Sequence, residues 1–209
     1  MEGLERIRLY FNQKPEMIPR AIITAVFVAV AIPAWWWIVR SSEKKAYERF
    51  TSGYYSYRNS NYSQAAASLG DLVTNYRNSK FTALGRYYLA LSHMATNNLE
   101  AAASELKFFM DENPKHFLRD RAYAISMAVE LNSGRPDKCV ELADRYLTEF
   151  GRESPSAPEL LYRKCVACQV LGNPQEASKS FAEAVESSKD GGNIFGNFAF
   201  YAQTAAPQM

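Results

Sequence analysis

Four short segments decide the fold that we predict for this chain: "SNYSQA" (60–65), "NNLEAA" (97–102), "GRPDKC" (134–139) and "GNPQEA" (172–177). Each segment joins a polar or glycine-bearing turn to a small residue or a cysteine at its last position. Those last positions are separated by 37, 37 and 38 residues; they are Ala65, Ala102, Cys139 and Ala177. A regular period between about 20 and 50 residues is the signature of a repeat protein.

Each repeat is predicted to contain two helices. In the second repeat, "ALGRYYLALSHMA" (83–95) and "LEAAASELKFFM" (99–110) both place apolar residues at helical spacing. An asparagine followed three residues later by Gln or Glu has the spacing of a capping box, which marks a helix start. This spacing occurs in Asn61 with Gln64, Asn97 with Glu100 and Asn173 with Glu176. A single hairpin cannot bury its own apolar face, so stacked neighbours must supply the core.

The residues around these small positions resemble the tetratricopeptide repeat. In that family a small residue lies twelve positions before the conserved alanine, and this place is taken here by Gly53, Ala90, Met127 and Cys165. A bulky residue follows the alanine by four positions, where this chain has Leu69, Leu106, Ala143 and Phe181. The resemblance covers residues 46–189. It implies an all-α, right-handed solenoid of about four helical hairpins.

A second feature is the run "AIITAVFVAVAIPAWWWIV" (21–39), which contains no charged residue. As a helix it would span roughly 28 Å, close to the hydrocarbon thickness of a bilayer. We therefore expect one transmembrane helix before the solenoid, with these membrane-interface residues: Arg20, Trp35, Trp36, Trp37 and Arg40. A cleaved signal peptide and a buried globular helix are the alternatives. Cleavage after the small residues at 29–31 is disfavoured, because the apolar run continues for eight residues beyond them.

These features predict five segments along the chain. A short amino-terminal segment (1–20) precedes the transmembrane helix (21–39) and a juxtamembrane linker (40–45). The tetratricopeptide-like repeats follow (46–189). The last residues (190–209) form either a cap on the final hairpin or a tail that docks elsewhere.

The sequence contains no recognisable catalytic constellation. Cys165 and Cys168 have the spacing of a redox motif, but they fall in the middle of a predicted helix, whereas a reactive thiol is favoured at a helix N-terminus. A zinc site would need two further ligands at the right spacing, and His93 and His116 do not supply them. We therefore predict a protein that is not an enzyme, with no cofactor, no metal site and no small-molecule substrate. The net charge of +2 also gives no reason to expect a nucleic-acid partner.

The first helix of each repeat is expected to line the inner surface of the solenoid. If the register of the resemblance holds, this partner-binding groove contains Tyr47, Phe50, Tyr54, Tyr57, Arg58, Leu84, Tyr87, Leu91, Met94 and Tyr162. Aromatic and methionine side chains in a groove can anchor a helix or an extended segment of another protein. The alternative is that these side chains pack against the neighbouring repeat or the juxtamembrane helix.

One anchor followed by a tetratricopeptide-like solenoid resembles the YfgM-type family of bacterial inner-membrane proteins, the ancillary subunits of the SecYEG translocon. This resemblance implies a cytoplasmic amino terminus, a periplasmic repeat domain and a role in handing secreted chains to chaperones. Basic residues on either side of the span do not by themselves decide the orientation. We predict a membrane-anchored adaptor that binds other proteins, including a membrane protein, near the bilayer. A permanent structural subunit of a larger membrane complex and an organelle-surface receptor are the alternatives.

Overall fold

The computed structural model describes residues 17–188, except for the side chains of residues 17–23 and 25. The predicted cap or tail (190–209) and most of the predicted amino-terminal segment (1–20) therefore lie outside the described residues. The chain divides into two compact units, Met1–Tyr47 and Glu48–Met209.

The described part of the first unit is helical and belongs to α2 (Met17–Arg58), whose last residues, from Glu48 on, fall in the second unit. Residues 40–45, which we expected to be a linker, are part of this helix, and Pro33 lies inside it. Among the described residues, no helix combines the length and the apolarity that crossing a membrane requires. The predicted transmembrane helix (21–39) thus has no support from the structure, although the side chains of residues 21–23 lie outside its described part.

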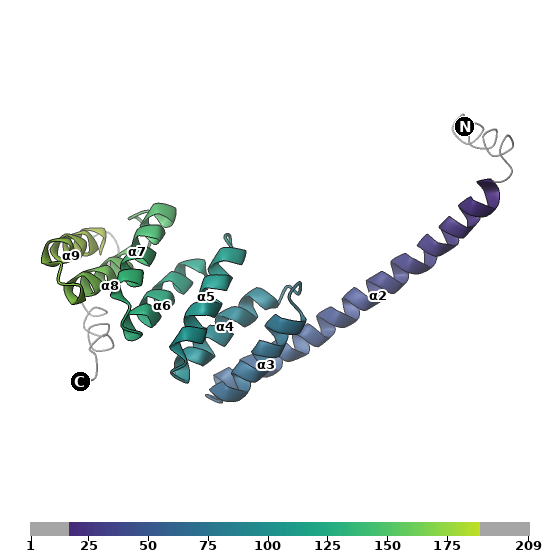
Figure 1. Ribbon diagram of the computed structural model, residues 1–209, viewed down its shortest axis with the longest axis horizontal. Helices are drawn as coiled ribbons and strands as arrows, with labels where there is room; N and C mark the ends of the chain where they lie inside the picture. The colour runs from purple at the N-terminus through teal and green to yellow at the C-terminus, as the bar shows by residue number, and fades with distance from the viewer. Residues whose placement is uncertain (1–16, 189–209) are drawn as a thin grey trace. The chain divides into compact units, whose positions relative to one another are not determined.

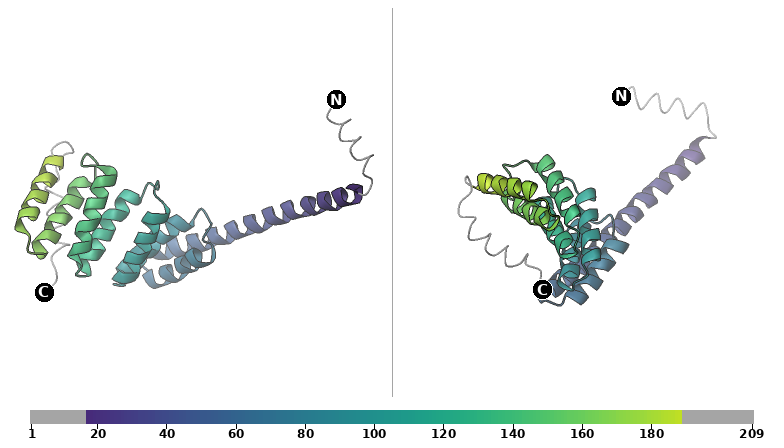
Figure 2. Two further views of the ribbon diagram at one scale, coloured as in Figure 1. Left: turned by 45° about the horizontal axis from the view of Figure 1, so that its top comes forward. Right: turned by 60° about the vertical axis from the view of Figure 1, so that its left-hand side comes forward.

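The second unit is a stack of helical hairpins, visible in order from α3 to α9 in Figures 1 and 2. The end of α2 pairs with the next helix, and three further hairpins follow. The helices after α2 are α3 (Tyr62–Asn75), α4 (Thr82–Ala95), α5 (Leu99–Glu112), α6 (Arg119–Asn132), α7 (Pro136–Phe150), α8 (Ala157–Val170) and α9 (Pro174–Ser188). From α3 to α9 consecutive helices pack on one another, both within a hairpin and between hairpins, and Gly53 and Arg49 of α2 lie against Leu69 and Asp71 of α3. The predicted all-α repeat of about four hairpins is confirmed for the described residues.

The same backbone turn joins the two helices of every hairpin. One residue in each turn has a positive φ: 59° at Ser60, 58° at Asn97, 68° at Gly134 and 71° at Gly172. The amide after it bonds back to the carbonyl five residues earlier, in the pattern that commonly ends a helix. These bonds join Asn61 to Ser56, Asn98 to His93, Arg135 to Glu130 and Asn173 to Cys168. The period of 37 or 38 residues in the sequence therefore reflects the regular recurrence of this turn.

This turn corrects one of the three predicted capping boxes. Asn61 and Asn173 do accept hydrogen bonds from the amides of Gln64 and Glu176, at 3.4 and 3.3 Å. Asn97, however, occupies the left-handed position, so Asn98 becomes the N-cap of α5, and its side chain makes no capping hydrogen bond. The predicted box at Asn97 is wrong because the turn uses that residue for its backbone conformation.

The small residues of the repeat lie where neighbouring helices approach most closely. All four of the period-defining residues are buried: Ala65, Ala102, Cys139 and Ala177. Gly53 shows how close the approach is, since a Cβ atom there would lie 2.5 Å from Cγ of Leu69. Leu69 and Leu106 are fully buried as the register predicts, whereas Phe181, their counterpart in the fourth hairpin, is 44 % exposed.

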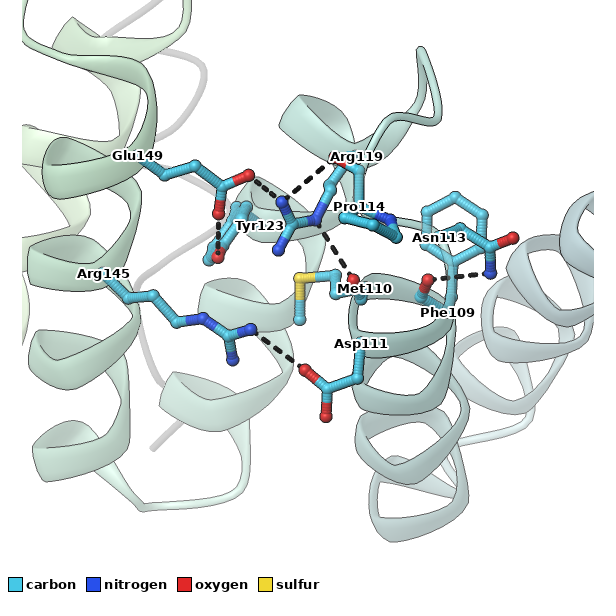
Figure 3. Close-up of polar contacts among 9 residues, drawn as sticks. All are labelled: Phe109, Met110, Asp111, Asn113, Pro114, Arg119, Tyr123, Arg145 and Glu149. Carbon is cyan, nitrogen blue, oxygen red and sulfur yellow. Dashed lines mark hydrogen bonds and ion pairs between the residues drawn. The ribbon is translucent and has the colours of Figure 1, made fainter.

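A buried arginine joins the second hairpin to the third (Figure 3). Nε of Arg119 donates to the carbonyl oxygen of Met110 at 3.1 Å, and Nη1 donates to that of Pro114 at 3.3 Å. The guanidinium also forms an ion pair with Glu149, which accepts a 3.0 Å hydrogen bond from the Tyr123 hydroxyl. Because these partners come from α5, from the loop after it and from α7, Arg119 fixes where α6 begins.

We expect Gly134→Ala to lower the free energy of unfolding by about 1 kcal/mol. A Cβ atom would meet nothing within 4 Å at this position, so the cost comes only from the positive φ of 68°. Gly70 lies inside α3 with equally open surroundings, so Gly70→Ala should instead stabilise by about 0.5–1 kcal/mol through helix propensity. Urea unfolding followed by circular dichroism measures both. Effects of the same sign would contradict the proposed role of the turn.

Candidate protein-binding surface

Five aromatic rings from the first two hairpins pack together on the first-helix side of the second unit. These rings form the aromatic cluster: Phe50, Tyr54, Tyr57, Phe81 and Tyr88. The ring centroids of Tyr54 and Tyr57 lie 4.9 and 5.3 Å from that of Tyr88 on α4. Phe50 stacks on Phe81, the residue just before α4, at 5.7 Å. Such contacts contribute about 0.5–1.5 kcal/mol per pair beyond the area that they bury.

The rings of the aromatic cluster are partly buried and partly open to solvent. Tyr54 and Tyr57 thus pack against the neighbouring repeat, as the alternative interpretation of the predicted groove has it, and they still expose part of each ring. Burial raises the pKa of Tyr57 and of Tyr88 above the ordinary value of a phenol. Both hydroxyls are therefore protonated at neutral pH and can donate a hydrogen bond.

One residue of the predicted groove belongs to the core instead. Tyr87 is only 5 % exposed, and its ring lies 5.7 Å from that of Phe109 on α5. The expectation that Tyr87 is exposed is wrong, and the adjacent Tyr88 takes its place on the surface. Phe81 and Tyr88 were not among the predicted groove residues. They are seven residues apart, a spacing that places two side chains on the same helical face.

The other predicted groove residues fall into three places. Leu84, Leu91 and Met94 of α4 are partly buried, and the last two pack against the hydrophobic core. Arg58 is exposed, and its Nη1 donates to the Tyr54 hydroxyl at 3.5 Å. Tyr162 lies in the fourth hairpin, beside a separate cavity of about 490 Å³ between α8 and α9. The structure thus brings together only the groove residues of the first two hairpins.

The predicted membrane-interface residues belong to the first unit. Trp35, Trp36 and Trp37 are each at least 60 % exposed, and the Arg40 guanidinium lies over the Trp36 ring at 5.0 Å. The side chain of Arg20 lies outside the described residues. Tyr47, the first residue of the predicted groove, is also in this unit and is 53 % exposed.

The cysteines are buried, unpaired thiols in the repeat core. Burial raises the pKa of Cys139 to about 12, and it also raises the pKa values of Cys165 and Cys168. A redox or nucleophilic cysteine needs the opposite shift. Within the described part of the chain, no group of three or more His, Cys, Asp or Glu side chains could hold a metal ion.

Stacked hairpins with buried small residues at a fixed period define this class of fold as a tetratricopeptide-like helical repeat. The crystal structure of MamA matches with a TM-score of 0.60 and 19 % sequence identity, over 77 % of this chain and 88 % of that chain. A Podosopora anserina putative kinesin light chain with nearly identical TPR-like repeats matches with a TM-score of 0.60 and 16 % identity, over 71 % and 77 % of the two chains. No protein-family model and no curated protein matches the sequence. At these identities the likeness establishes the fold alone.

We expect the three thiols of the native chain to react far more slowly with Ellman's reagent at pH 8 than those of the unfolded chain. Their raised pKa values leave little thiolate at that pH, and burial blocks access. In urea all three should react at once. Rapid reaction of Cys165 or Cys168 in the native chain would reopen the question of a redox role.

Proposed function

We propose that this chain is a non-catalytic scaffold that binds another protein through the aromatic cluster. The observation that carries the proposal is the partial exposure of Phe50, Tyr54, Tyr57 and Tyr88 as one connected set of rings on two hairpins. Aromatic side chains held rigidly by their own packing lose little entropy when a partner covers them, and they dominate many protein interfaces. Leu84, Leu91 and Met94 on α4 extend the same side with adaptable apolar contacts.

The proposal includes a membrane tether, which rests on the sequence of residues 21–39. An uncharged run of this length, with Trp35–Trp37 and Arg40 at one end, suits a bilayer span and its interface. Tethering would hold the aromatic cluster near a membrane partner and raise its effective concentration there. By resemblance to the translocon-associated family, we place the amino terminus in the bacterial cytoplasm and the repeats in the periplasm, in an ancillary translocon or envelope-chaperoning role.

A permanent subunit of a membrane complex is the second candidate. The last described hairpin favours it, because Val170, Leu171 and Phe181 are 68, 49 and 44 % exposed, as expected of a surface that a constant neighbour covers. Purification of the intact chain in mild detergent separates the candidates. A fixed stoichiometric set of proteins that survives size exclusion supports the subunit, and substoichiometric partners support the adaptor.

We expect the double variant Tyr54→Ser, Tyr57→Ser to capture the main co-purifying protein at least tenfold less well, as for the loss of two interface anchors. Tyr55→Ser is the matched control, because Tyr55 is 63 % exposed on the same helix and its ring contacts Tyr54 of that helix rather than α4. The double variant should also melt at a lower temperature, since both rings pack on Tyr88. Circular dichroism shows whether it stays folded. A folded double variant with undiminished capture would refute the proposed surface.

The tether predicts that the chain resists alkaline carbonate extraction and that Val28→Arg with Ala31→Arg releases it. Each arginine at the centre of a span costs about 2.5–3.5 kcal/mol. Ala31→Leu is the control and should stay in the membrane fraction. Release of the unmodified chain by carbonate would disprove the tether.

A cysteine introduced at the exposed position Thr148 would show on which side of the membrane the repeats lie. Because the native thiols are buried, an impermeant thiol reagent would label only the introduced cysteine, and only from the side that carries the repeats.

A further inference from the structure

Two arginines stand out among the charges of the first helices of the hairpins, which are the Glu48–Arg58 part of α2 together with α4, α6 and α8. Every other lysine or arginine on these helices has a carboxylate within ion-pair distance. The pairs are Arg49 with Asp71, Arg86 with Glu105, Arg119 with Glu149, Arg163 with Glu159 and Lys164 with Asp144. Arg58 and Arg121 are exposed and form no ion pair with any described residue.

The carboxylates of the same helices are almost all engaged elsewhere. Asp120 accepts hydrogen bonds from the hydroxyls of Tyr146 and Ser156. Glu130 is buried and lies 2.5 Å from Arg135, and Glu159 pairs with Arg163. Among the described carboxylates of these helices, only Glu48 forms neither an ion pair nor a side-chain hydrogen bond. The first-helix side therefore carries positive charge that the fold does not neutralise.

Arg58 borders the aromatic cluster, and Arg121 lies exposed on α6, the next first helix along the stack. Arg58 donates to the hydroxyl of Tyr54, whose ring packs edge-on against Tyr88. On the other side, the ring of Tyr87 lies 5.6 Å from that of Tyr88. Burial raises the pKa of Tyr87, and the nearby Arg121 guanidinium opposes that rise. Contacts thus lead from Arg58 as far as Tyr87, whose hydroxyl is influenced by the charge of Arg121.

The helical geometry of α6 explains why one of its arginines is paired and the other is not. Arg119 points toward Met110, Pro114 and Glu149, as Figure 3 shows. Arg121 follows two residues later, about 200° further around the helix. Its side chain therefore leaves α6 on the side opposite to that of Arg119, where it is exposed.

We propose that the aromatic cluster, flanked by Arg58 and Arg121, binds an acidic segment of a protein partner. Apolar side chains of that segment lie against Tyr54, Tyr57 and Tyr88, while its Asp or Glu carboxylates meet the two guanidinium groups. Arginine is suited to this role because its planar fork can grip a carboxylate with two hydrogen bonds. The protonated tyrosine hydroxyls add donors to the same surface. This inference rests on the proposed function and names the chemistry of its partner.

The test uses the intact chain in detergent and three fluorescein-labelled peptides of equal length. They consist of repeated Glu-Leu-Glu-Ala, Gln-Leu-Gln-Ala or Lys-Leu-Lys-Ala units, and binding is followed by fluorescence anisotropy. We expect the glutamate peptide to bind most tightly and to weaken as salt is added. Arg58→Gln with Arg121→Gln should weaken it about fivefold, as befits exposed charge pairs, and should leave the glutamine peptide unchanged.

Arg77→Gln is the matched control. Arg77 is also exposed and unpaired among the described residues, but it lies beside Val73, Phe108 and Glu112, away from the aromatic cluster. It should leave the affinity for the glutamate peptide unchanged. Equal binding of the glutamate and glutamine peptides, lost in the Tyr54→Ser, Tyr57→Ser variant, would overturn the acidic preference and leave the protein-binding function standing. Binding of a single-stranded oligonucleotide but of no peptide would overturn this inference, while capture of a protein partner tests the function separately.

Discussion

One backbone constraint governs the second unit: the chain must reverse direction after each first helix by way of a single residue in the left-handed conformation. The amide that follows this residue then closes the helix on a carbonyl five residues back. Because the turn recurs at Ser60, Asn97, Gly134 and Gly172, each second helix leaves its turn in the same way. The small residue five positions further on is then always buried where helices meet. Identical hairpins can therefore stack, and stacking supplies a core that no hairpin has alone.

The stack also decides which side chains remain available to a partner. The first helices use most of their charged groups to hold the hairpins together, as Arg119 does between the second and third and Lys164 does with Asp144 and Glu176. Around the aromatic cluster most contacts join rings and hydroxyls, and the exposed Arg58 forms no ion pair with a described residue. The difference between these regions follows from sequence changes at equivalent repeat positions rather than from any change of backbone.

The fold could be predicted from the sequence because its period is carried by small residues and turns, which local rules describe well. The exposure of single side chains could not, since Tyr87 and Tyr88 differ by only about 100° around one helix and the family register assigned the wrong one to the surface. The predicted capping box at Asn97 was wrong for a similar reason, because an asparagine suits both an N-cap and a left-handed turn. Whether an arginine such as Arg58 or Arg121 has an ion-pair partner depends on residues that are distant in the sequence, as Glu149 is from Arg119. No sequence window contains that information.

The three buried thiols have a consequence for where the chain can work. An odd number of cysteines would ordinarily be a hazard in an oxidising compartment, since one thiol is left to form a mixed disulfide or to cross-link two molecules. Here Cys139, Cys165 and Cys168 serve as compact packing groups that the folded repeats shield from oxidants and foldases alike. Burial of all three thiols in the folded repeats thus makes an odd cysteine count compatible with an oxidising compartment as well as with a reducing one.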